Sequence, residues 1–130
     1  MDDLLVISVA AKPDAHFAGY DLLQAITATG MQFGEMNIFH FIKDNQTLFS
    51  MASATKPGEF DIDRIGAFSC AGLTLFMNYR SVPDPKFAFD LMLKTAEQLA
   101  DDLHGELRAG QRVPLTSDIL KQYENKILAL

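Results

Sequence analysis

The apolar positions of the chain follow two periodicities, one typical of strands and one typical of helices. Short β-branched or apolar runs predict strands, and apolar residues spaced three or four positions apart predict helices. The predicted strands cover residues 4–9, 35–41, 47–54, 73–77, 106–108 and 111–113. The predicted helices cover residues 18–29, 85–103 and a last segment that follows Thr116.

Cap and turn residues mark the ends of these elements. Asp84 followed by Pro85 is a typical helix start, because aspartate caps the first turn and proline fits the first helical position. Gly30 and Gly105 stand where the first two helices should end. Asp44 and Asn45 suit the turn of a hairpin between the second and third strands.

The order of the elements predicts an α+β fold, with a mostly antiparallel sheet and the helices on one of its faces. The sequence contains no repeat, no low-complexity tract and no linker. We therefore expect residues 1–130 to form a single domain.

The strands are apolar on both sides, which is unusual for a sheet with helices on one face. If Leu5, Ile7 and Val9 point toward the helices, Leu4 and Val6 point away from them. The centres of the first, third and fourth strands carry no charge on either side. Helices over both faces would explain this pattern. The other explanation is an exposed apolar groove for a peptide partner.

Composition narrows the possible partners. The 130 residues include 17 acidic and 11 basic side chains, a net charge of −6, which argues against nucleic acid as a partner. No apolar run reaches the roughly 18 residues that a membrane span requires. Cys70 is the one cysteine, so an internal disulfide is impossible and a reducing compartment is expected.

Catalytic and metal-binding signals are weak. The three histidines, His16, His40 and His104, lie far apart and lack zinc-site spacing. Cys70 has no charged neighbour that would activate it, so a small buried residue is the better interpretation. Residues 61–72 start like a calcium loop but lack its later oxygen ligands. The sequence thus predicts no metal, no cofactor and no enzyme activity.

Several segments also carry a family resemblance. They are Val9-Ala10-Ala11, Gly34-Glu35-Met36-Asn37-Ile38, Leu48-Phe49-Ser50-Met51-Ala52, Lys56-Pro57-Gly58-Glu59-Phe60-Asp61, Gly72-Leu73-Thr74-Leu75-Phe76-Met77 and Gln111-Arg112. In this order they resemble the ZipA C-terminal domain family of bacterial division proteins, over nearly the whole chain. The segments over residues 34–38 and 56–61 together are the most specific to this family.

The resemblance implies a split β-α-β fold, with a six-stranded mainly antiparallel sheet and three helices on one face. It implies that the open sheet face binds the C-terminal tail peptide of FtsZ, the tubulin-like ring protein. It also implies a full protein with an N-terminal inner-membrane helix and a flexible linker outside this chain. This domain would then lie at the division septum on the cytoplasmic face of the inner membrane, without direct membrane contact.

Carried over by position, the resemblance implies a groove of ten partner-binding residues. They are Leu4, Val6, Met36, Ile38, Ala52, Ala54, Lys56, Thr74 and Phe76, with Arg112 at the rim. Lys56 would contact a carbonyl or carboxylate at the peptide end. The best-known family member has methionine at the position of Ala54, so the groove here would lose about 1–2 kcal/mol of apolar contact.

The leading hypothesis is therefore a non-enzymatic adaptor domain that docks the FtsZ tail in a shallow apolar groove. One alternative is an RNA-binding sheet, which would need aromatic and basic residues together on its face. Another is a small-molecule-binding α+β domain, which would need a deep enclosed cavity.

Overall fold

The computed structural model describes residues 3–110 and 112–130. Its strands are Leu4–Ala10 (β1), Phe17–Ala18 (β2), Gln32–Phe33 (β3), Phe39–Lys43 (β4), Gln46–Ser53 (β5), Ser69–Cys70 (β6), Gly72–Asn78 (β7) and Glu106–Arg108 (β8). Its α-helices are Gly19–Thr29 (α1), Pro85–Leu103 (α2) and Ser117–Leu128 (α3), and its 3-10 turns are Glu35–Asn37 (η1) and Ile62–Ala67 (η2).

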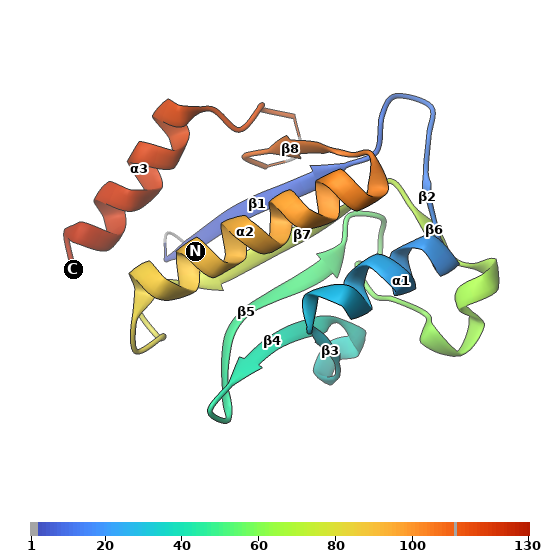
Figure 1. The fold of residues 1–130 in the computed structure, drawn as a ribbon, viewed down its shortest axis with the longest axis horizontal. Coiled ribbons are helices and arrows are strands. Elements are labelled where there is room, and N and C mark those ends of the chain that lie inside the picture. The colour runs from blue at the N-terminus through green and yellow to red at the C-terminus, as the bar shows by residue number, and fades with distance from the viewer. Residues whose placement is uncertain (1–2, 111) are drawn as a thin grey trace.

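Six strands form one antiparallel sheet in the order β3-β4-β5-β7-β1-β8 (Figure 1). Strands β2 and β6 form a separate two-stranded pair beside the first turn of α1. Short connections join β3 to β4 and β4 to β5, whereas β1, the strand next to the edge strand β8, pairs with β7, far along the chain. The predicted α+β class with a six-stranded antiparallel sheet and three helices is confirmed.

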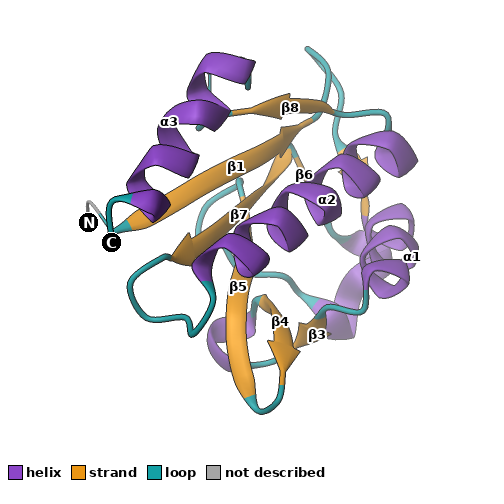
Figure 2. Ribbon diagram, turned by 60° about the vertical axis from the view of Figure 1, so that its left-hand side comes forward, coloured by secondary structure: helices purple, strands orange, loops and turns teal. Residues whose placement is uncertain are grey.

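Helices α1 and α2 cover one face of the sheet, and the core lies between them and the strands (Figures 1 and 2). Every second residue of β1 and β7 points into this layer and is almost fully buried. These residues are Leu5, Ile7, Val9, Leu73, Leu75 and Met77. From the helices, Leu22, Phe89, Met92 and Leu99 complete the same cluster. Burial of each large apolar side chain contributes about 1.5–3 kcal/mol to stability.

Helix α3 packs at the edge of the sheet, next to α2. Strand β8 pairs with β1 only from Ser8 to Ala10, so no strand of the described residues lies beside the first half of β1 on that side. Tyr123 of α3 takes that place: its hydroxyl donates to the Val6 carbonyl oxygen at 2.9 Å. The Tyr123 ring also meets Phe89 of α2 edge-on, with ring centroids 6.0 Å apart.

The predicted helix starts and the predicted hairpin are confirmed. The side chain of Asp84 accepts a hydrogen bond from the Phe87 amide at 3.2 Å, with Pro85 at the first helical position. Gly30 ends α1 with a φ of +85°. The turn residues Asp44 and Asn45 have φ values of +53° and +64°, as the tight turn of a hairpin requires.

The second predicted strand begins later than its apolar pattern indicates. Residues 35–37 form the turn η1, and the strand starts at Phe39. Met36 and Asn37 have φ values of +62° and +57°, in the left-handed region that interrupts a strand. The His40 ring stabilises this turn, because its Nε2 donates to the Glu35 carbonyl oxygen at 2.9 Å. Such a contact depends on the tertiary structure and leaves no periodic signal.

Helix α2 ends at Leu103 as predicted, but the residue that caps its end is not the predicted Gly105. His104, with a φ of +57°, is the left-handed residue that ends the helix, and Gly105 follows it. The glycine is needed for close packing: a Cβ there would lie 2.9 Å from Val9 Cγ1 and 3.0 Å from the Ala10 carbonyl oxygen. Gly105 therefore allows the chain to turn tightly against β1.

The predicted strand over residues 111–113 was wrong for the two of these residues that the structure describes. Arg112 and Val113 form a bend, and one isolated bridge joins Arg108 to Pro114. Proline has no amide hydrogen, so the pairing stops there. Gln111 lies outside the described residues.

Candidate partner-binding face of the sheet

The strand register assigns alternate side chains to the face opposite α1 and α2, which we call the open face. Val6 of β1 lies opposite Phe76 of β7, and Phe76 lies opposite Ser50 of β5. Ser50 in turn lies opposite His40 of β4. One row across the open face therefore runs through four strands.

Two further rows lie on either side of this one. Ser8, Thr74 and Ala52 form the row toward the end of β1. Leu4 and Asn78 form the row at the start of β1. The structure thus brings together five of the ten predicted site residues on the open face, from three adjacent strands.

These five residues are accessible but not fully exposed. Val6, Ala52, Thr74 and Phe76 are half-buried, and Leu4 is 42% exposed. None of them carries a charge, so the middle of the open face is uncharged and partly apolar. A patch of this kind on a folded domain typically marks a partner site.

The two predicted residues before β4 differ sharply in exposure. Ile38 is buried and lies outside the main core cluster. Met36 is 70% exposed at the tip of η1. His40 holds η1 at the edge of the open face: its Nδ1 lies 2.7 Å from Ser50 Oγ, and its Nε2 donates to Glu35 O. In the tautomer that carries its proton on Nε2, Nδ1 accepts from the Ser50 hydroxyl.

Ala54 lies at the other end of the open face, just after β5. Its amide donates to the Gly72 carbonyl oxygen at 2.9 Å, and its side chain is exposed. Lys56 is exposed in the turn that follows. Arg112 is exposed in the bend after β8, and no described contact joins it to the groove residues.

Two residues of the open face, His40 and Arg108, were not predicted from the sequence. His40 is buried there, and Arg108 lies opposite Ser8 on the edge strand β8. The alternation of Glu106, Leu107 and Arg108 could have placed both charged residues on one face. Arg108 Nη2 lies 3.5 Å from Glu106 Oε1, so these two edge charges form an ion pair.

A cavity of about 430 Å³ opens beside the Ala54 end of the open face. Ser8, Ala10, Ala54 and Gly72 line it from the sheet, and the loop over residues 11–16 forms its outer wall. In the sequence, the small size of these residues is the one feature that points to this cavity.

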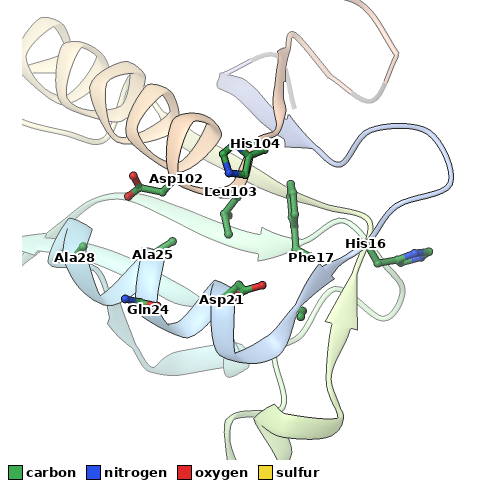
Figure 3. Close-up of a pocket in the computed structure, with 10 residues that line it drawn as sticks. His16, Phe17, Asp21, Gln24, Ala25, Ala28, Asp102, Leu103 and His104 are labelled. Carbon is green, nitrogen blue, oxygen red and sulfur yellow. The ribbon is translucent and has the colours of Figure 1, made fainter.

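A second cavity, of about 440 Å³, lies on the helical side of the molecule (Figure 3). Asp21 and Gln24 of α1 face the end of α2 across it, and the His16 ring points away from the other side chains. Among residues 3–110 and 112–130, no three His, Cys, Asp or Glu side chains gather in a way that could hold a metal ion. This cavity therefore carries no metal-site argument.

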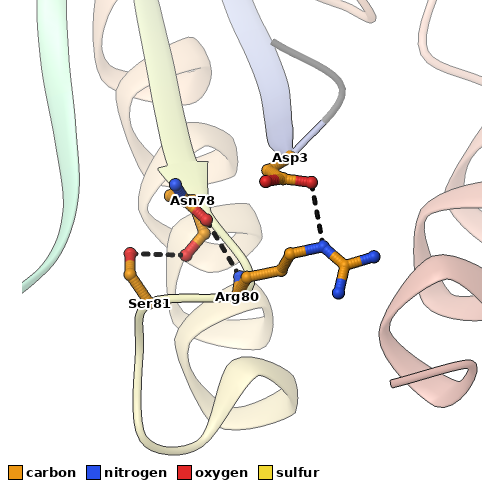
Figure 4. Close-up of polar contacts among 4 residues, drawn as sticks. All are labelled: Asp3, Asn78, Arg80 and Ser81. Carbon is orange, nitrogen blue, oxygen red and sulfur yellow. Dashed lines mark hydrogen bonds and ion pairs between the residues drawn. The ribbon is translucent and has the colours of Figure 1, made fainter.

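A polar network closes the Leu4 end of the open face (Figure 4). Arg80 Nε donates to Asp3 Oδ1 at 2.9 Å, and the Arg80 amide donates to Asn78 Oδ1 at 3.0 Å. The Tyr79 amide donates to the Asp3 carbonyl oxygen at 3.1 Å. These contacts join the turn after β7 to the start of β1 and so position Leu4.

Cys70 is fully buried in β6, as its apolar surroundings in the sequence suggested. Its thiol donates to the Gly72 carbonyl oxygen at 3.3 Å. Burial raises the pKa of the thiol, which the contact with Gly72 opposes more weakly. A buried thiol that holds its proton is a poor nucleophile.

The described part of the chain has no helix that is both long and apolar enough to cross a lipid bilayer.

The sequence matches a known family over residues 3–126, described as "ZipA, C-terminal FtsZ-binding domain". The relatives include the cell division protein ZipA of Ectopseudomonas mendocina, 41% identical over 132 residues, which cover 98% of this chain and 48% of that protein. ZipA of Pseudomonas aeruginosa PAO1 is 40% identical over 98% of this chain and 46% of its own length. ZipA of Pseudomonas putida W619 is 41% identical over 98% and 45%.

The chain spans about half the length of these curated relatives. The family match takes in every α-helix start and every strand, including all the strands that build the open face. The chain therefore belongs to the family of ZipA C-terminal FtsZ-binding domains.

Proposed function

We propose that this domain binds the C-terminal tail peptide of FtsZ in the shallow groove on the open face, as a non-enzymatic adaptor in cell division. The observation that carries this proposal is the uncharged centre of the open face, where Val6 and Phe76 lie side by side opposite the helical layer. Family membership supplies the partner. We assign the groove to the ten predicted residues, with Val6, Phe76 and Thr74 at its centre.

The expected binding energy comes mainly from apolar contact. A short peptide on a shallow groove buries less surface than a standard protein interface, and the tail must order when it binds. Both effects keep the affinity of one tail modest. A filament that carries many tails compensates through avidity.

The wider role in the cell follows from the same proposal. We infer that residues 1–130 act as one domain, held at the cytoplasmic face of the inner membrane at the division septum. The anchor would lie in the part of the ZipA proteins that this chain does not span. Binding of FtsZ tails would then tether the division ring to the membrane.

The decisive experiment is a calorimetric titration of a synthetic FtsZ tail peptide into the wild-type chain and into Phe76→Ala. We expect Phe76→Ala to weaken binding at least ten-fold, since an aromatic side chain supplies much of such an interface. Phe87→Ala is the matched control, because Phe87 is 45% exposed on α2. Equal affinity of the wild type and Phe76→Ala would refute the groove.

A folding defect must be separated from a binding defect. Ala52→Glu places a charge on the half-buried centre of the groove without removing a core side chain. We expect a normal melting transition for this variant and loss of peptide binding. A filter-binding assay tests the RNA-binding alternative, with single-stranded RNA added as a competitor of the tail peptide. Tail peptide that stays bound to the domain would argue against this alternative, and displacement of the peptide by RNA would favour it.

A further inference from the structure

The cavity at the Ala54 end of the open face is a hollow built from small residues. Ala10, Ala54, Ala71, Gly72 and Ser8 line it, and we call it the alanine pocket. Its volume of about 430 Å³ lies in the range of small ligand sites. It lies outside the ten predicted groove residues except for Ala54.

Gly72 lines the bottom of the pocket, and because it has no side chain it leaves this space empty. A Cβ on Gly72 would lie 2.9 Å from the Val9 carbonyl oxygen and 3.4 Å from the Ala54 Cβ. Gly72 pairs with Ala10 in the sheet register, so two neighbouring strands both present minimal side chains here.

Ser8 supplies a second and independent observation. It is only 5% exposed, and its Oγ has no hydrogen-bond partner among the described residues. The register places its side chain on the open face, between Thr74 and Arg108, and the residue lines the pocket. A buried hydroxyl without a partner destabilises the free domain, and a polar group that enters the pocket could satisfy it.

The pocket is continuous with the groove. Ala10 lies two residues beyond Ser8 on β1, a step of about 7 Å along the strand. Ala54 borders both the groove and the pocket. A peptide that crosses Phe76 and Thr74 in an extended conformation therefore reaches the pocket with its next residues.

We propose, on the basis of the proposed function, that the alanine pocket is a further subsite for the FtsZ tail. One large apolar side chain of the tail fills the pocket, and a backbone amide or carbonyl of the tail pairs with Ser8 Oγ. The rim carries charges of both signs, Lys12 and Arg108 with Asp14, so the subsite selects by shape and not by charge.

The first test fills the pocket. Ala10→Leu should weaken binding of the FtsZ tail peptide about ten-fold, because a leucine-sized group would displace one buried apolar side chain. Ala28→Leu is the matched control, because Ala28 is an exposed alanine of α1, the helix on the face of the sheet opposite the open face. Ala71→Leu fills the pocket from an exposed loop position and replaces Ala10→Leu if that variant melts early.

The second test separates a binding role of Ser8 from a structural one. Ser8→Ala should raise the melting temperature of the free chain, because it removes the unsatisfied hydroxyl, and should weaken tail binding about two- to five-fold. A purely structural residue would change both quantities in the same sense. Unchanged affinity in Ser8→Ala would overturn the proposed hydrogen bond.

A double-mutant cycle identifies the side chain that fills the pocket. Each apolar residue of the tail peptide is replaced by alanine and titrated against the wild type and Ala10→Leu. We expect one position whose replacement weakens binding to the wild type but not to Ala10→Leu. If Phe76→Ala weakens binding but no tail position couples to Ala10→Leu, the subsite is refuted and the groove stands. If Phe76→Ala has no effect either, the proposed function itself fails.

Discussion

Tyr123 and Val6, which lie 117 residues apart in sequence, are joined by a hydrogen bond at the side of β1 that faces β8. The Tyr123 hydroxyl donates to the Val6 carbonyl oxygen at 2.9 Å, where β8 has already ended. Val6 is also a centre of the candidate groove, so α3 supports the strand that carries the groove. Without this contact, the Val6 carbonyl would lack its partner in a partly buried position.

Tyr123→Phe should therefore destabilise the fold without changing its core shape. Loss of the hydrogen bond leaves the Val6 carbonyl oxygen unsatisfied and should lower the free energy of unfolding by about 1–2 kcal/mol. Urea denaturation followed by circular dichroism measures this difference. Tyr20→Phe is the control, since Tyr20 is 69% exposed. Equal losses in both variants would contradict the role of the Val6 contact.

Stability at alkaline pH should also depend on Tyr123. Burial raises the pKa of its phenol above the ordinary value of 10.0. The folded state thus keeps this proton at a pH at which the unfolded state releases it. The resulting stability is complete below the unfolded pKa and is lost as the pH rises from about 10 through the folded pKa. The free energy of unfolding of the wild type should fall more steeply than that of Tyr123→Phe above pH 10, and parallel curves would contradict this.

Much of the fold could be predicted because its apolar periodicities are regular. Helix α2 begins and ends as its sequence indicates, since Asp84 and Pro85 mark its start and apolar residues repeat along it. The turn η1 could not be predicted, because the left-handed conformation of Met36 depends on the contact between His40 and Glu35. Local preferences do not encode such a contact.

The sequence could predict which residues share the open face of the sheet, but it could not predict the alanine pocket in that face. Alternation in β1 and β7 placed Val6, Thr74 and Phe76 together, because the side-chain period of a strand is fixed. The alanine pocket depends on the pairing of Ala10 with Gly72, which joins residues from distant parts of the chain. Register of this kind is set by the whole sheet and cannot be read from either strand alone.

Cys70 should be protected from thiol reagents in the folded chain. It is fully buried, and burial raises the pKa of its thiol, so little thiolate is present near neutral pH. We expect the reaction with Ellman's reagent to be slow in buffer and to reach one thiol per chain in denaturant. Free glutathione under the same conditions is the control for reagent reactivity. Rapid modification in buffer would contradict the buried position of β6.

Gly19 should be among the least replaceable residues. A Cβ at Gly19 would overlap the Ile65 carbonyl oxygen and lie 2.9 Å from the Phe68 carbonyl oxygen, both backbone atoms of the segment around η2. Gly19→Ala should therefore lower the free energy of unfolding by about 3 kcal/mol or more. Gly30→Ala meets no atom within 4 Å and has only the strain of its φ of +85°, about 1 kcal/mol. Thermal melts of the two variants should differ clearly, and equal melting temperatures would contradict the close approach of η2.

The effect of Ala54→Met on the affinity for the FtsZ tail should show whether Ala54 is only a wall of the groove or also lines a pocket that the tail fills. If Ala54 were merely a groove wall, a methionine would add about 1–2 kcal/mol of apolar contact with the FtsZ tail and strengthen binding. Because Ala54 also lines the alanine pocket, we expect the methionine to occupy the pocket and to exclude the side chain of the tail. Titration of the tail peptide should then show binding several-fold weaker than that of the wild type. The side chain of Ala54 is exposed, so the variant should melt within a few degrees of the wild type, and any change in affinity can be read as an effect on binding.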